Sequence, residues 1–266
     1  MPFKKFFNLA EIKEVIFRMD AAAILGWYDI KLSYRRTKLG LFWMSLTLII
    51  ESLILCFLFS HLFNEDFYSF YKYIFVGNII WRLISTIIND SMNALIASRS
   101  YILNTDIPII VLIARIVFKS LIIFFHNMVF ALLLISFGGL SSISIYWLTI
   151  PLAAVFIALS IMPYAFILAV LGARFRDLIF LRPYMLQILF YITPIVWKTE
   201  YLSGKYAFVF KLNPFIGLLE FLRSIFLSQS FDASILIPTF ICGIVGWTLA
   251  IVTYNMCKDR VCYWIL

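Results

Sequence analysis

Six long stretches of apolar residues constrain the fold of this 266-residue chain more than any other feature. Each is about as long as the roughly 20 residues that an α-helix needs to cross the hydrocarbon core of a bilayer. The composition agrees, because 64% of the residues are hydrophobic and only 14% are charged, too few to cover a water-exposed surface. We therefore expect an all-α polytopic membrane protein with six transmembrane helices. The predicted spans are residues 40–63, 73–97, 109–137, 145–172, 178–197 and 234–256.

The distribution of lysine and arginine predicts how these helices are oriented. With the N-terminus inside the cell, fourteen of the 22 residues lie on the cytoplasmic side, five lie outside, and three lie within or beside spans. Such an excess on cytoplasmic loops is the usual orientation signal of membrane proteins. We therefore place both termini in the cytoplasm. The net charge of +8 follows from these flanking residues, so it gives no reason to expect nucleic-acid binding.

Two segments outside the spans also carry apolar residues. Residues 3–32 place apolar side chains at helical spacing between charges, which predicts an amphipathic helix on the inner membrane surface. The chain accordingly divides into an interfacial segment, 1–38, and a transmembrane domain, 39–266. Segment 198–233, before the last span, is partly apolar but is interrupted by an Asn-Pro pair. We expect short re-entrant or interfacial helices there, facing the exterior.

The first two spans carry charged residues at similar depths. Trp43, Thr47 and Glu51 follow at steps of four and so share one helical face, while Arg82 belongs to a polar stripe on the second span. With a rise of about 1.5 Å per residue, Glu51 lies roughly 16 Å deep and Arg82 roughly 14 Å deep, both near the midplane. We predict that the two pair, either to lock two helices together or to face a transported substrate.

The third and fifth spans also carry polar residues. Lys119 and His126 are seven residues apart and share a face of the third span. Tyr184, Gln187 and Tyr191 recur at steps of three and four, which gives the fifth span a face of hydroxyl, amide and aromatic groups. Aromatic rings stack on the apolar faces of sugars, so this face suits a sugar as well as ordinary packing between helices.

The familiar catalytic and metal-binding motifs are absent from the sequence. No G-x-x-x-x-G-K-[ST] pattern occurs, so we do not expect this chain to bind nucleotide through a P-loop. With two histidines and no H-E-x-x-H or G-x-S-x-G pattern, we expect neither a metal site nor catalytic residues, and an intramembrane transferase lacks support. A secondary transporter that relays ions through Glu51, Arg82 and Lys119 stays open as an alternative, although no internal repeat typical of that class is visible.

Four segments show recognisable patterns in a fixed order along the chain. They are residues 29–43 (DIKLSYRRTKLGLFW), 173–177 (ARFRD), 191–197 (YITPIVW) and 212–223 (LNPFIGLLEFLR). They stand before the first span, after the fourth, at the end of the fifth and ahead of the sixth. Together they resemble the ABC-2 type permeases that export O-antigen, capsule and teichoic acid polymers. The resemblance covers about the whole chain.

The resemblance implies a non-catalytic subunit that moves lipid-linked polysaccharide out of the cytoplasm across a bacterial inner membrane. Such permeases form homodimers above two ATP-binding cassette ATPase subunits, so ATP would bind the partner and this chain would hold no cofactor. A glycan linked to a lipid diphosphate arrives from the inner leaflet, and its sugar chain passes between the two copies. The residues expected to line the channel are Trp43, Thr47, Glu51, Arg82, Tyr184, Gln187 and Tyr191.

Two further groups of residues receive roles from their position and from the resemblance. Arg35, Arg36 and Lys38 lie at the inner headgroup level, where they suit either the diphosphate or plain anchoring of the chain. Two cytoplasmic connections suit either contact with the ATPase or simple solvated turns. Their candidate coupling residues are Asn104, Thr105, Asp106, Arg174, Arg176 and Asp177.

Overall fold

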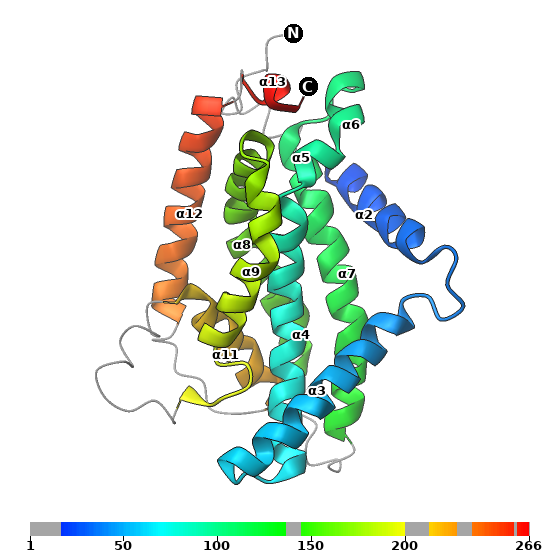
Figure 1. The fold of residues 1–266 in the computed structure, drawn as a ribbon, viewed down its shortest axis with the longest axis vertical. Coiled ribbons are helices and arrows are strands. Elements are labelled where there is room, and N and C mark those ends of the chain that lie inside the picture. The colour runs from blue at the N-terminus through cyan, green and yellow to red at the C-terminus, as the bar shows by residue number, and fades with distance from the viewer. Residues whose placement is uncertain (1–16, 137–144, 200–212, 228–235, 258–259, 266) are drawn as a thin grey trace.

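The computed structural model describes residues 17–136, 145–199, 213–227, 236–257 and 260–265. Within these ranges the secondary structure is helical, and the long helices form a bundle with α2 inclined at its edge (Figure 1). The helices are α2 (Met19–Tyr34), α3 (Phe42–Phe63), α4 (Phe67–Ser91), α5 (Ala94–Ala97), α6 (Arg99–Asn104), α7 (Ile109–Ser136), the 3-10 helix η2 (Ile145–Thr149), α8 (Ile150–Arg174), α9 (Asp177–Ile192), α11 (Pro214–Leu227), α12 (Leu236–Cys257) and α13 (Val261–Ile265).

Four helical stretches of the described chain are long and apolar enough to cross a membrane: Phe42–Phe63, Ile109–Ser136, Ile145–Arg174 and Thr239–Cys257. They match the predicted first, third, fourth and sixth spans to within a few residues. The predicted second and fifth spans are also helical, as α4 and α9. However, α4 carries the polar stripe, and α9 is only 16 residues long. The chain is therefore an all-α membrane protein. Four of its six predicted spans correspond to helices that are long and apolar enough to cross a membrane.

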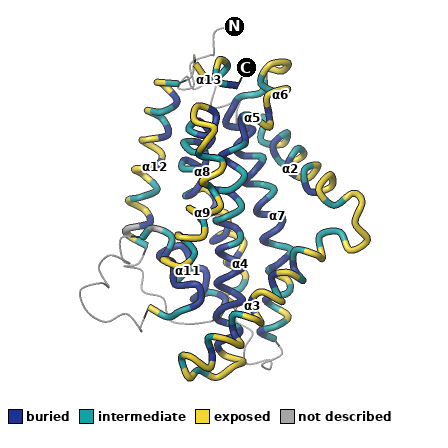
Figure 2. Tube along the Cα trace, in the orientation of Figure 1, coloured by how far each residue is buried: buried dark blue, intermediate teal, exposed yellow. Residues whose placement is uncertain are grey.

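Helix α4 forms the core of the bundle, where it contacts α3, α7, α8 and α11. Residues are buried along its whole length, whereas about half of the residues of α3 and of α12 are exposed (Figure 2). This explains the polar composition of α4, because its polar groups meet protein partners rather than lipid. Asn78, for example, donates a 2.9 Å hydrogen bond to the Ser52 hydroxyl of α3. Only 22% of the apolar window of α3 and 17% of that of α12 are buried, which leaves their apolar side chains facing outward.

Local signals in the sequence explain where several helices begin and end. Asn64 ends α3 in the left-handed conformation, with φ of 53°, and Asp66 caps α4 by accepting a 2.9 Å hydrogen bond from the Ser69 amide. These bonds from Ser69 to the exposed Asp66 carboxylate hold the pKa of Asp66 below its ordinary value. Helix α9 ends at Ile192, just before Thr193 and Pro194, because proline cannot donate the backbone hydrogen bond that would continue the helix.

Residues 3–16 of the predicted amphipathic helix lie outside the described residues, and helix α2 begins at Met19. Ala22, Gly26 and Ile30 of α2 are buried at steps of four, and the helix contacts α7. A β-carbon on Gly26 would come 2.8 Å from the Arg115 carbonyl oxygen of α7, so glycine permits this close approach. The opposite side of α2 exposes apolar residues such as Ile24 and Trp27, and its position on the membrane surface stays a prediction.

Part of the predicted re-entrant segment is described. Helix α11 begins at Pro214, so the Asn-Pro pair marks the start of a helix, a position that proline favours. Helix α11 contacts α4, α8 and α12, which buries its apolar face against the bundle. Its last turn is held by Trp147 of η2, whose indole N–H donates to the Phe226 carbonyl oxygen at 3.1 Å. Residues 200–212 and 228–235 of the predicted segment lie outside the described residues.

Candidate functional site

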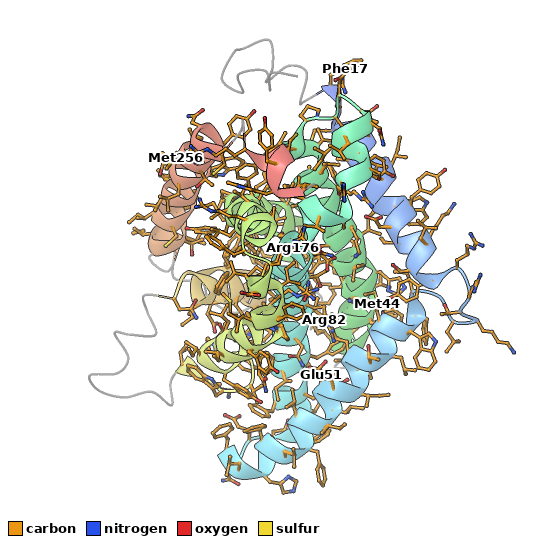
Figure 3. The ribbon with its side chains drawn as sticks, turned by 45° about the horizontal axis from the view of Figure 1, so that its top comes forward. Phe17, Met44, Glu51, Arg82, Arg176 and Met256 are labelled. Carbon is orange, nitrogen blue, oxygen red and sulfur yellow. The ribbon has the colours of Figure 1, made fainter. Side chains whose placement is uncertain are left out.

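Glu51 of α3 and Arg82 of α4 form an ion pair, which confirms the pairing predicted from their depths (Figure 3). An Arg82 Nη2–H donates to Glu51 Oε2 at 2.9 Å. Both side chains stay about half exposed, with 40% of Arg82 and 48% of Glu51 accessible. An ion pair that served only to hold two helices together would be expected to be buried between those helices. This pair is instead accessible from one side of the chain. That accessibility makes it the centre of the candidate site.

A small cavity of about 100 Å³ adjoins this ion pair and joins three helices. Its lining includes Asn78, Trp81 and Ser85 of α4 and Phe190 of α9. The Phe190 ring meets the edge of Trp81, with ring centroids 5.9 Å apart. The aromatic end of α9 is therefore held beside the charges of α3 and α4, and the adjacent Tyr191 is exposed at the same end of α9.

The remaining predicted channel residues lie on the open sides of α3 and α9. Trp43 is 45% exposed, and Thr47 is exposed with its hydroxyl donating to carbonyl oxygens of its own helix. Helix α9 buries none of its residues, and Tyr184, Gln187 and Tyr191 are all exposed. The predicted aromatic and amide face is thus present and uncovered in the single chain. Its role in lining a channel stays a prediction.

Lys119 and His126 share a face of α7 but meet different partners. Lys119 donates to Asp90 of α4 at 2.7 Å, whereas His126 lies 3.0 Å from the Ser45 hydroxyl of α3. The three charges that a secondary transporter was expected to use are therefore not assembled in one network. Glu51 and Arg82 form one ion pair, and Lys119 belongs to another.

A further ion pair, between Asp29 and Arg115, escaped the sequence analysis. Arg115 of α7 donates from Nε and from Nη2 to the two carboxylate oxygens of Asp29 on α2, the former at 2.5 Å. This two-point contact ties the interfacial helix to the bundle. The signal in the sequence was an arginine six residues into an apolar span, with no acidic residue in that span to pair it.

Arg223 of α11 was also missed, and its side chain is completely buried. It donates to the Tyr73 hydroxyl at 2.7 Å, the Pro194 carbonyl oxygen at 2.9 Å and Glu220 at 2.9 Å. Its guanidinium lies 3.8 Å from the centre of the Tyr73 ring. A β-carbon on Gly77 would overlap this guanidinium, so glycine makes room for it. Arg223 thereby fixes the backbone at the end of α9 to α4.

Arg35, Arg36 and Lys38 all lie in the connection between α2 and α3 and are exposed. Within the described chain they form no ion pair. The connection turns at Gly40, whose φ is +55° and whose amide donates to the Thr37 hydroxyl at 3.1 Å. The three basic side chains are therefore free to meet an anion or a headgroup, and both roles stay predictions.

The two candidate coupling regions lie at one end of the bundle, with α13 near both (Figure 1). Asn104, Thr105 and Asp106 are exposed at the end of α6, where the Asp106 carbonyl oxygen accepts a 3.0 Å hydrogen bond from Arg18. This bond connects the region to the start of α2. Arg174, Arg176 and Asp177 are exposed at the turn between α8 and α9, and Arg174 lies over the Trp264 ring of α13. Their contact with an ATPase stays a prediction.

Fold and site together define a multi-pass α-helical membrane protein in which a half-exposed ion pair joins two of the helices. The chain is 21% identical over 242 residues to an O-antigen export system permease protein RfbA of Klebsiella pneumoniae, covering 91% of this chain and 93% of that protein. A second RfbA protein of this organism is 20% identical with the same coverage, and one of Myxococcus xanthus is 23% identical over 74% of this chain and 76% of its own. No protein-family model matches. The resemblance to export permeases predicted from four segments is confirmed.

Proposed function

We propose that this chain is the membrane-spanning permease subunit of an ATP-driven exporter that carries lipid-linked polysaccharide across a bacterial inner membrane. The observation that carries the proposal is the similarity to O-antigen export permeases over 91% of the chain. The fold adds a multi-pass helical bundle, and the described residues hold no cluster of potential metal ligands. The chain would move its substrate without catalysing a reaction, because ATP would be hydrolysed on a separate subunit.

The proposal includes six crossings with both termini in the cytoplasm. Helix α4 would be the second crossing, because its polar groups are satisfied by α3, α7 and α9 rather than exposed to lipid. Helix α9 would be the fifth, with the backbone beyond Ile192 completing the passage. The start of α2 and α13 both lie at the same end of the bundle (Figure 1), as an even number of crossings requires.

The proposal also includes a second copy of the chain. A charged side chain facing lipid at the bilayer centre costs about 2.5–3.5 kcal/mol on insertion scales. The half-exposed Glu51 and Arg82 therefore need water or protein on their open side. Two copies that faced each other across α3 and α9 would enclose a passage lined by these charges and by the residues on the open sides of those helices. Trp43, Thr47, Tyr184, Gln187 and Tyr191 would then contact the sugar chain.

Substrate access and energy coupling complete the proposal. Arg35, Arg36 and Lys38 would attract the lipid diphosphate at the inner membrane surface, because guanidinium and ammonium groups suit phosphate oxygens. Two ATPase subunits would contact the exposed ends of α6 and of the α8–α9 turn. The Arg18–Asp106 hydrogen bond would transmit movement of the α6 end to α2, beside the proposed access route.

Reconstitution into proteoliposomes tests this function. Vesicles would contain this chain, its co-purifying ATPase and a lipid-linked glycan, and transport would be followed by the susceptibility of the glycan to an external glycosidase. We expect ATP-dependent transport that stops when the P-loop lysine of the ATPase is replaced. Transport driven by a proton or sodium gradient without the ATPase would contradict the proposal and favour a secondary transporter.

A further inference from the structure

A cavity of about 340 Å³ lies between α2, α4, α5, α7 and α9, away from the Glu51–Arg82 pair. This volume is within the range of roughly 300–1,000 Å³ that is usual for small-molecule sites. Its walls hold three basic side chains, Arg115, Lys119 and Arg182, and two acidic ones, Asp29 and Asp90. Charged groups from four different helices therefore converge on one hollow.

The pairing of these groups leaves one positive charge in excess. Arg115 pairs with Asp29, and Lys119 pairs with Asp90. Arg182 of α9 forms no ion pair within the described residues, and its Nη1–H donates at 3.0 Å to a neutral group, the Asn89 carbonyl oxygen. Its Nε–H is buried and has no hydrogen-bond partner in the described chain. A buried donor without a partner is uncommon because the unmade hydrogen bond costs free energy, so an acceptor bound at this position would be stabilised.

Neutral donors stand on the same wall as these charges. Asn93 and Ser98 both line the cavity, and neither side chain donates a hydrogen bond in the described structure. Guanidinium, amide and hydroxyl groups around one hollow are the donors that phosphate-binding sites use. The two carboxylates are occupied by their own cations, so the group left to be neutralised is Arg182.

We propose that this cavity binds a phosphate-type anion through Arg182, with Asn93 and Lys119 as further donors. Lys119 engages Asp90 through one N–H and keeps others for a ligand. Ser33, which lines the cavity, precedes the basic connection that starts at Arg35 by two residues. An anion attracted to that connection would therefore find the cavity as its next binding position. In its lipid-borne form the inference rests on the proposed function, because the anion would then be the diphosphate of the substrate.

Binding measured on the purified chain in detergent, without an ATPase, tests the inference. The probes are farnesyl diphosphate and inorganic pyrophosphate, with titration calorimetry as the readout. Arg182→Gln removes the charge, and Asn93→Asp adds a negative charge to the wall without removing any ion pair. We expect each to weaken farnesyl diphosphate binding by at least about tenfold, in line with loss of a charge-assisted hydrogen bond. Arg260→Gln, at an exposed arginine outside the cavity lining, should change it less than about twofold.

The two probes distinguish the source of the anion. Binding of farnesyl diphosphate alone supports a lipid-borne ligand, and binding of both supports a site for the phosphate groups themselves. If neither probe binds, or if Arg182→Gln and Asn93→Asp bind as the unaltered chain does, the inference is wrong. Arg182-dependent binding together with a failure of ATP-driven transport would keep the anion site and remove only the proposed function.

Discussion

Arg223 and Tyr73, 150 residues apart in the sequence, meet in two ways. The guanidinium of Arg223 lies over the Tyr73 ring and also donates to the hydroxyl of that residue. The same guanidinium binds the carbonyl oxygens of Pro194 and Ile195, where the backbone leaves α9. One side chain thus connects α11, α4 and the end of α9, and supplies donors to backbone carbonyl groups just beyond that helix.

Replacing Arg223 with methionine is expected to destabilise the chain strongly. The change keeps an extended apolar stem but leaves two carbonyl oxygens, a tyrosine hydroxyl and Glu220 without their shared donor. Breaking a buried charged contact of this kind costs about 3–5 kcal/mol. Thermal unfolding in detergent would show a large fall in Tm. Arg99→Met, at an exposed arginine of α6, is the matched control and should leave Tm almost unchanged.

Replacement by alanine should have opposite effects on stability at two glycines. A β-carbon on Gly172 of α8 would overlap the Met92 carbonyl group, which is backbone and cannot swing aside. We expect Gly172→Ala to destabilise by about 1–3 kcal/mol, as overpacking does. Gly243 of α12 has nothing near its would-be β-carbon, so Gly243→Ala should be neutral or should stabilise by up to about 1 kcal/mol through helix propensity. Equal effects in an unfolding assay would contradict this difference in packing.

The Glu51–Arg82 ion pair predicts non-additive mutations. Glu51→Gln and Arg82→Gln each leave a charge without its partner inside the membrane. The exchanged variant, with Glu51→Arg and Arg82→Glu together, restores a pair of opposite charges. In a double-mutant cycle of unfolding that combines Glu51→Gln with Arg82→Gln, we expect a coupling energy of about 0.5–3 kcal/mol, as for residues in direct contact. If the single variants and the exchanged variant are equally stable, the pair contributes nothing to the fold.

Cysteine labelling would test whether the open side of α9 faces water. Gln187 of α9 and Ile244 of α12 are both exposed in the single chain. If two copies enclose a passage across α9, Gln187→Cys should react with a water-soluble maleimide in proteoliposomes, whereas Ile244→Cys should be shielded by lipid. The four native cysteines would first be replaced. Equal labelling of both positions would argue against an aqueous passage at α9.

Asp66 predicts a pH effect on stability outside the membrane core. Because hydrogen bonds from Ser69 lower its pKa below the ordinary value of 3.8, the charged cap stabilises the folded state fully above that pH. This contribution is lost as the pH falls towards the folded-state pKa. Asp66→Asn keeps a capping side chain that does not titrate. Its Tm should therefore be lower than that of the unaltered chain at pH 6, and the gap should close towards pH 3.

The positions of the long helices could be predicted because the length of an apolar run specifies a membrane-crossing helix directly. The Glu51–Arg82 contact could be predicted for a similar reason, since depth along two neighbouring antiparallel helices follows from counting residues. The polar stripe of α4 was visible as well. The sequence did not show that α4 would be the buried centre of the bundle, because the burial of a helix depends on which other helices surround it.

The contacts of Arg223 and Arg115 could not be predicted from local patterns. Arg223 looks like an ordinary surface residue of a short amphipathic helix until Tyr73 and the end of α9 are brought to it. Arg115 pairs with Asp29 only because Gly26 lets α2 lie close against α7. Both contacts depend on how separate helices dock. Docking angles follow from side-chain shape across an interface, which helical periodicity in one segment does not encode.

The space that Gly77 leaves for the Arg223 guanidinium has a consequence for how relatives of this chain can diverge. Because the Arg223 guanidinium fills the space beside Gly77, a mutation at either position alone should destabilise the fold. A larger residue at 77 would overlap the guanidinium, and a shorter residue at 223 would leave a cavity and acceptors without a donor. Positions 77 and 223 should therefore vary together among relatives. Where position 77 holds a residue larger than glycine, position 223 should hold a residue shorter than arginine. Such paired changes would record this contact even between proteins that share only a fifth of their residues.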